Sequence, residues 1–260
     1  MRRRPLIAGA LGFALAACAG QRQRAVPQAP VVLLGEVHDH PAGHARRLEL
    51  MRALLAQGRR PAVIMEQLDA SRQQALDRVL AERTADAGAV IAAAGTTGWD
   101  WPLYRPYLDE ALAHRLPLIG ANLARAAARE VMRDGLAAHG FDAAVPDDVL
   151  ARQTQQIETG HCGKVDRAMA ASMALGQVAR DQLMARLVES RASGGALLLA
   201  GNGHVRTDIG VPRWLSPATR RISVAIGFVE PGDDVIAYDR RIELPAHPRP
   251  DPCAAFAGAG

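Results

Sequence analysis

The chain has 260 residues, a formal net charge of +4 and a hydrophobic content of 49%. Three of its positive charges lie in an N-terminal segment that we expect to be removed, which leaves a net charge of about +1. That balance excludes a strongly basic surface, so the high isoelectric point does not argue for nucleic-acid binding. About 230 residues remain, enough for one α/β domain or for a domain with a small lid.

The first 18 residues have the features of a bacterial lipoprotein signal. Three arginines precede an apolar stretch from Pro5 to Ala17, which is too short to span a bilayer as a helix. The stretch ends in Leu15-Ala16-Ala17-Cys18, which resembles a lipobox, so we expect lipidation of Cys18. An ordinary secretory signal with a chance cysteine is the alternative. Residues 19–30 have the composition of a polar tether, and Ala19 indicates an outer-membrane lipoprotein that faces the periplasm.

Apolar and amphipathic patterns alternate along the rest of the chain. Short apolar runs, typical of buried parallel strands, lie at 31–34, 62–66, 117–121, 196–200 and 222–228. Helical patterns lie between them, at 39–57, 71–82, 103–114 and through most of 124–192. This alternation predicts an α/β domain over 31–240, with a mostly parallel central sheet flanked by helices.

Three segments depart from this simple alternation. The segment 124–192 is longer than the connection between two parallel strands needs to be. We therefore expect a helical insertion there, a lid or subdomain before the fourth strand. Residues 84–101 have an irregular pattern. A short strand is expected at 235–238, and the tail over 241–260 is expected to be disordered.

Two of the predicted strands run into the same short motif. The first is followed by Gly35-Glu36-Val37-His38, and the fourth by Gly201-Asn202-Gly203-His204. In open α/β sheets, ligands bind beyond the carboxyl ends of the strands. We therefore expect the two imidazoles to lie over one crevice. Glu66, at the end of the second strand, is expected to join them.

This set of side chains suits two kinds of chemistry. Imidazole and carboxylate groups together bind divalent transition metals such as Zn, Mn or Fe(II), so Glu36, His38, Glu66 and His204 are the candidate metal ligands. The same groups can serve general acid–base catalysis. For each residue alone, a structural role such as an ion pair or a helix cap is the alternative.

A second group of residues suits a flat, apolar ligand. His40 and His44 are four residues apart at the start of a predicted helix, so they share a face. Trp101 and Tyr104 belong to an aromatic cluster in an aromatic-poor chain, and a tyrosine phenolate can ligate haem iron. The pair Arg180-Asp181 either faces the site or forms a local ion pair. The alternative for the aromatic residues is that they anchor an irregular loop to the core.

Two cysteines remain after the signal segment. In an oxidising periplasm, Cys162 and Cys253 could pair and fasten the tail. Equally, one could be a loop thiol and the other part of a disordered end. The sequence leaves both readings open.

The ordered motifs together resemble the ChaN family of the Tiki and erythromycin-esterase-like superfamily. The matching segments are Gly35–His44, Trp99–Tyr104, Leu118–Leu123, His161–Gly163, Gln177–Asp181, Gly201–Arg206 and Gly210–Pro212. The resemblance implies an α/β fold and a cell-envelope lipoprotein that binds haem in haem or iron uptake. It also implies a homodimer that sandwiches haem, and a haem-uptake receptor as a partner.

The resemblance leaves two sets of site residues open. For haem binding, the candidate contacts are Tyr104, His40, His44, Trp101 and Arg180. The two Gly-x-x-His turns also resemble those that hold metal in Tiki-type proteases. The alternative function is therefore a divalent-metal-dependent hydrolase that uses Glu36, His38, Glu66 and His204.

Overall fold

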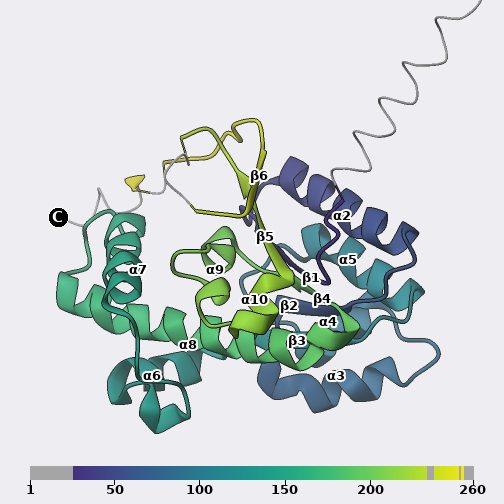
Figure 1. Ribbon diagram of the computed structural model, residues 1–260, viewed down its shortest axis with the longest axis horizontal. Helices are drawn as coiled ribbons and strands as arrows, with labels where there is room; N and C mark the ends of the chain where they lie inside the picture. The colour runs from purple at the N-terminus through teal and green to yellow at the C-terminus, as the bar shows by residue number, and fades with distance from the viewer. Residues whose placement is uncertain (1–25, 233–236, 252, 255–260) are drawn as a thin grey trace, which may run out of the picture.

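The computed structural model describes residues 26–232, 237–251, 253 and 254. A single sheet of six parallel strands forms its centre, in the order β3-β2-β4-β1-β5-β6 (Figure 1). The strands are β1 (Val31–Leu34), β2 (Ala62–Asp69), β3 (Leu118–Asn122), β4 (Ala196–Leu199), β5 (Ser223–Val229) and β6 (Arg240–Glu243). The predicted α/β class with a mostly parallel sheet is confirmed. The predicted signal segment, with Cys18, and residues 19–25 of the tether lie outside the described residues.

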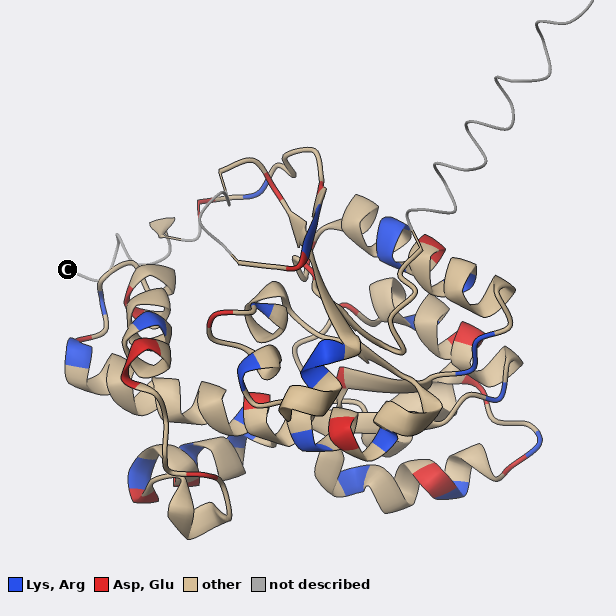
Figure 2. Ribbon diagram, viewed as in Figure 1, with Lys and Arg blue, Asp and Glu red and all other residues tan. Residues whose placement is uncertain are grey.

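Helices cover both faces of the sheet. They are α2 (Pro41–Ala56), α3 (Gln73–Leu80), α4 (Ala87–Ala94), α5 (Trp101–Ala113), α6 (Arg125–Asp134), α7 (Asp147–Gly160), α8 (Arg167–Arg191), α9 (Asn202–Val205) and α10 (Pro217–Arg221). No helix in the described ranges is both long enough and apolar enough to cross a membrane. Acidic and basic residues are interspersed over the helices in the view of Figure 2.

The strands form the core because both of their faces are apolar. Val32 and Leu34 of β1 point into one hydrophobic cluster, which contains the buried residues of α2 and α5. Val31 and Leu33 point into a second cluster, which is closed by α8. Continuous apolar strands of this kind are typical of parallel sheets that are covered on both sides.

The predicted helical insertion consists of α6, α7 and α8. Helix α8 packs against β2, β3 and β4, whereas α6 and α7 make their main contacts with α8. The pair α6 and α7 therefore lies at one end of the molecule, away from α2 and α5 (Figure 1). This arrangement extends the body beyond the carboxyl edge of the sheet.

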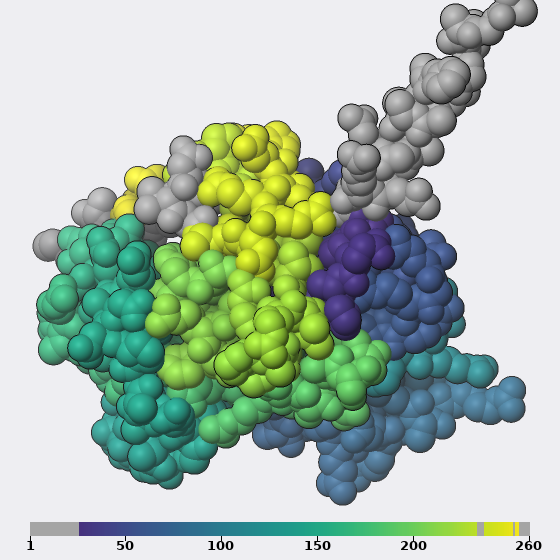
Figure 3. All heavy atoms as spheres, in the orientation of Figure 1, coloured from purple at the N-terminus to yellow at the C-terminus, as the bar shows by residue number. Residues whose placement is uncertain are grey.

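The tail differs from the prediction. Of the expected strand at 235–238, residues 235 and 236 are not described, and residues 237 and 238 have no regular secondary structure. A strand forms instead at Arg240–Glu243, parallel to β5. The disorder predicted from residue 241 is wrong as far as residue 251. Leu244 is buried in the core, and Arg249 forms ion pairs with Asp39 and Glu230. The tail lies against the body in Figure 3, where it is yellow.

A disulfide bond fastens the end of this tail. It joins Cys253 to Cys162, in the connection between α7 and α8, with 5.7 Å between the Cα atoms. Of the two readings that the sequence left open, the structure has the paired one.

Candidate functional site

The two Gly-x-x-His turns lie side by side, because β1 and β4 are neighbours in the sheet. Leu34 pairs with Leu199 at the ends of the two strands. Beyond them, the Asn202 N–H donates to the carbonyl of Glu36 at 2.9 Å. A Cβ atom at Gly201 would lie 2.8 Å from the His38 ring, so glycine at this position leaves room for the imidazole.

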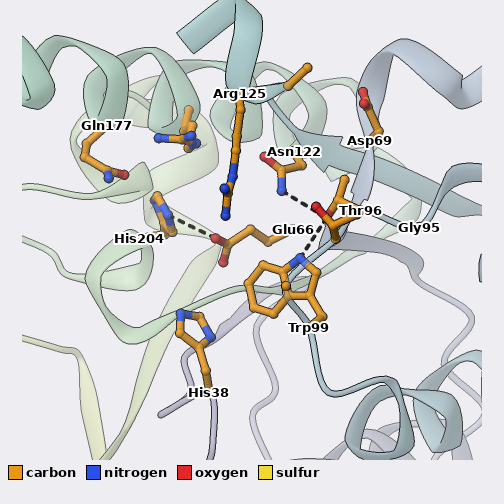
Figure 4. A pocket seen from close by; sticks show the side chains of 14 residues that line it. His38, Glu66, Asp69, Gly95, Thr96, Trp99, Asn122, Arg125, Gln177 and His204 are labelled. Atoms are coloured by element: carbon orange, nitrogen blue, oxygen red, sulfur yellow. Dashed lines mark hydrogen bonds and ion pairs between the residues drawn. The ribbon is translucent and has the colours of Figure 1, made fainter. Parts of the chain in front are cut away.

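The turns open into a cavity of about 620 Å³ at the carboxyl edge of the sheet. The lining includes His38, Glu66 and His204, the convergence that we expected from the strand ends, and it also includes Arg180 (Figure 4). Its further polar or aromatic residues are Asp69, Thr96, Thr97, Trp99, Asn122, Arg125 and Gln177. Its size is within the range of small-molecule sites, about 300–1,000 Å³.

A second cavity, of about 770 Å³, adjoins the first at the two histidines. Gln153, Gln156, His161, Arg206 and Arg249 are among its lining residues, which come from α7, the turn at α9 and the tail. His38, Gln177 and His204 line both cavities. The two histidines therefore stand between two spaces that a ligand could enter.

His38 is oriented by the carboxylate of Glu36. Its Nδ1 lies 2.8 Å from Glu36 Oε1, and its side chain is 54% exposed. A carboxylate only accepts hydrogen bonds, so Nδ1 carries the proton and the lone pair is on Nε2. Burial lowers the pKa of His38, and the Glu66 carboxylate only partly offsets this. The imidazole is therefore neutral at pH 7. Its ring also contacts the edge of Trp99, with 4.9 Å between the centroids.

Glu36 itself is buried, and both of its carboxylate oxygens have partners within the protein. Arg47 forms an ion pair with Oε2, and the Tyr104 hydroxyl donates to Oε1 at 2.7 Å. Gln67 donates to the same oxygen at 3.3 Å. Glu36 thus serves to hold His38 rather than to bind a ligand directly.

A second histidine lies between two buried carboxylates. His204 Nδ1 is 2.6 Å from Asp181 Oδ1, and Nε2 is 3.4 Å from Glu66 Oε1. Burial disfavours the charged form of His204, but the two carboxylates outweigh it and raise the pKa to about 10. At Glu66, burial favours the neutral form of the carboxyl group, but His204 outweighs this effect and lowers the pKa of Glu66 to about 2. The pair is therefore an imidazolium and a carboxylate at pH 7.

Asp181 is a site residue that the sequence analysis named only together with Arg180, as facing the site or forming a local ion pair. Its side chain is fully buried, and burial raises its pKa to about 6 in spite of His204. Gln153 of α7 donates to its other oxygen at 3.2 Å. The only sequence signal was its position beside Arg180, on a helix that we had expected to be a lid.

The four predicted metal ligands do not form a metal centre in this structure. Within the described ranges, no group of three or more His, Cys, Asp or Glu side chains is placed to hold a metal ion. Glu36 is neutralised by Arg47, and both ring nitrogens of His204 face carboxylates. The predicted metal site is thus replaced by two separate histidine–carboxylate units.

Three of the predicted haem contacts are instead buried structural residues. Tyr104 is only 1% exposed, and its hydroxyl is held by Glu36. His40 caps α2, where Nδ1 accepts from the Gly43 N–H at 3.0 Å, and its Nε2 donates to the Pro245 carbonyl at 2.9 Å. His44 Nε2 donates to the His38 carbonyl at 3.0 Å. None of these side chains lines the cavity, because all three are buried and held in the interior by these hydrogen bonds.

The other two predicted haem contacts differ from each other. Trp101 packs against the core and against the Tyr104 ring, at 6.1 Å between centroids, and is not part of the cavity lining. Arg180 does line the cavity. The neighbouring aromatic residue Trp99 also lines it, and its indole N–H is fixed by Thr96 Oγ1 at 2.7 Å. The aromatic surface of the site therefore comes from Trp99.

Comparisons with known proteins agree with this fold. Residues 23–215 match the family described as Haem-binding uptake, Tiki superfamily, ChaN. Among solved structures, the chain is similar to ChaN of Campylobacter jejuni, a structure of cofacial haem binding. The TM-score is 0.69 and the identity 21%, over 82% of this chain and 86% of that chain.

A weaker likeness connects the chain to an erythromycin esterase, EreC, in a structure of its H289N mutant. The TM-score is 0.44 and the identity 16%, over 83% of this chain and 73% of that chain. No curated protein sequence matches the chain.

Proposed function

Because the chain belongs to the ChaN family of haem-binding uptake proteins in the Tiki superfamily, we propose that it binds haem in the cavity beside His38. The ring would lie against Trp99, and the iron would be ligated by His38 Nε2. Haem iron in proteins is commonly held by a histidine imidazole.

The state of His38 is the observation that carries this proposal. Its Nδ1 is bonded to the Glu36 carboxylate, so the lone pair of Nε2 is left for a ligand. Metal-binding histidines almost always donate their other ring N–H to such a partner, which fixes the tautomer and makes the ligating nitrogen more basic. The side chain is also exposed and has a lowered pKa, so no proton has to be displaced at pH 7.

A place in the cell envelope completes the proposal. The lipobox-like sequence that ends at Cys18 supports a lipid anchor in the outer membrane, with the domain facing the periplasm. The disulfide between Cys162 and Cys253 supports an oxidising compartment. There the protein would take part in haem or iron uptake, receive haem from or pass it to an uptake receptor, and form a homodimer that encloses haem, by analogy with the cofacial binding in the Campylobacter protein.

The test is a titration of the chain from Gly20 onward with haemin. We expect saturable binding with a shifted Soret band. His38→Ala should weaken binding by roughly tenfold or more, since removing the orienting partner of a ligand alone costs about 10–100-fold. His114→Ala, which removes a surface histidine on the far end of α5, is the matched control and should bind like the wild type. An unchanged affinity and Soret position in His38→Ala would exclude His38 as the ligand.

A further inference from the structure

Two arginines line the cavity without a partner. Arg125 is the first residue of α6, and Arg180 lies in α8. Among the described residues, neither guanidinium group has a hydrogen bond or an ion pair, although other arginines near the site do: Arg206 is held by Asp208, and Arg249 by Asp39. Both side chains belong to the same cavity lining, and Figure 4 shows Arg125 extending into it.

The nearby carboxylates are already engaged elsewhere. Glu66 accepts from the Gly201 N–H at 2.7 Å and pairs with His204. Asp181 is held by His204 and Gln153. Asp69 accepts from the backbone N–H and the hydroxyl of Ser71. These internal pairings leave the two guanidinium groups free for an anion from outside.

Their environment favours such an anion. Burial lowers the pKa of Arg180, and the carboxylates of Glu66 and Asp181, which are already paired with His204, only partly offset this. Arg125 is close enough to repel Arg180 electrostatically. A guanidinium group presents a planar fork of donors that matches a carboxylate in bidentate geometry. Two adjacent forks thus suit a ligand with two carboxylates.

We propose that Arg125 and Arg180 form a carboxylate clamp, which binds the two propionate groups of a tetrapyrrole whose ring lies against Trp99. The inference deepens the proposed function and rests on it. In Figure 4, Arg125 and His38 lie on opposite sides of Glu66. The clamp and the iron ligand would therefore act on different parts of one ligand, and they can be tested separately.

The experiment compares three ligands under identical detergent conditions: haemin, its dimethyl ester, and iron-free protoporphyrin IX. Binding to the chain from Gly20 onward is followed by Soret absorbance and by quenching of tryptophan fluorescence. The variants are Arg125→Gln and Arg180→Gln, with Arg180→Lys as the conservative change. Arg167→Gln, on the exposed start of α8, is the matched control. Because neither clamp residue has a partner in the fold, circular dichroism should show unchanged folding.

Each glutamine variant should bind haemin and protoporphyrin IX roughly tenfold more weakly, as expected for the loss of a charge-assisted hydrogen bond. The dimethyl ester should bind the wild type weakly and should be insensitive to both changes. Arg180→Lys should recover part of the affinity, and Arg167→Gln should have no effect. His38→Ala should weaken haemin but not protoporphyrin IX, since the latter has no iron.

Two results would overturn the clamp. Equal affinity of the wild type for haemin and its dimethyl ester would leave the proposed function intact and remove the role of the propionates. Wild-type affinity for haemin in Arg125→Gln and Arg180→Gln would do the same. The absence of saturable binding for every ligand would instead remove the proposed function, and the clamp with it.

Discussion

Arg47 and Glu36 form an ion pair in the interior, with both side chains essentially inaccessible to solvent. The pair connects α2 to the turn after β1, and Arg47 also donates to the Leu34 carbonyl at 3.1 Å. Since Glu36 in turn holds His38, the orientation of the exposed imidazole depends on a guanidinium group that no ligand can touch.

Replacing Arg47 by methionine should therefore destabilise the protein strongly. Removing one partner leaves the Glu36 carboxylate buried and unpaired, and we expect a loss of about 3–5 kcal/mol in the free energy of unfolding. Urea denaturation measures it. The control is the adjacent surface pair, in which Arg46→Met should cost less than about 1 kcal/mol because Arg46 and Glu49 are exposed. Similar losses in both variants would contradict the buried role.

The pairing of His204 should appear in the pH dependence of stability. The folded-state pKa of His204 is raised from 6.5 to about 10. Its contribution to the free energy of unfolding is therefore complete below pH 6.5 and is lost as the pH rises through 10. Between pH 7 and 9.5 the wild type should lose about 1–3 kcal/mol more than His204→Gln. Urea titrations of both proteins at several pH values test this. Parallel curves would show that the imidazolium contributes nothing.

Haem binding should persist in mildly acidic solution. The pKa of His38 is lowered, first by burial, so the neutral ring survives below the ordinary value of 6.5. The Soret change should keep its full amplitude at pH 6.5 and decline only at lower pH. A midpoint at or above pH 6.5 would mean that His38 titrates like a solvent-exposed histidine.

The bond between Cys162 and Cys253 should contribute to stability through the unfolded state. The two residues are separated by 91 positions. Disulfide bonds typically stabilise a protein by roughly 2–4 kcal/mol, and more for longer loops. Thermal unfolding with and without reductant measures the effect. A double variant with serine at both positions should match the reduced wild type and should not respond to reductant.

The lipid anchor is tested outside the folded domain. Cys18→Ser should abolish acyl labelling and membrane fractionation, because the thiol is the site of lipidation in a lipobox. Cys253→Ser, which keeps Cys18, should still be labelled. Continued labelling of the Cys18 variant would remove the lipoprotein proposal.

The sequence predicted the sheet well because its strands are uninterrupted apolar runs. It missed β6, since Arg240, Arg241 and Glu243 make a polar edge strand that has no such pattern. It also missed α4, an alanine-rich helix without a clear polar face that begins after the cap Asp86. Both elements form because of their contacts with neighbouring elements, and their own residues have no pattern that would predict them.

The sequence predicted that the site lies at the carboxyl edge of the sheet, but it did not predict the role of each side chain there. The recurrence of Gly-x-x-His correctly brought His38 and His204 together. It did not reveal that His40, His44 and Tyr104 turn inward, because burial of a polar motif residue depends on contacts with distant segments. The pairing of Asp181 with His204 was missed for the same reason, since Asp181 lies on a helix 23 residues before its partner.

The adjacency of β1 and β4 also sets the order in which the site can assemble. Their pairing joins Val31 to Ala196, so most of the chain must be synthesised before the two turns can meet. Contacts of such long sequence separation form late and slowly, since a large loop must close first. A nascent chain that ends before His204 would contain the supported His38 turn but no completed cavity. The proposed binding of haem is thereby restricted to the finished fold.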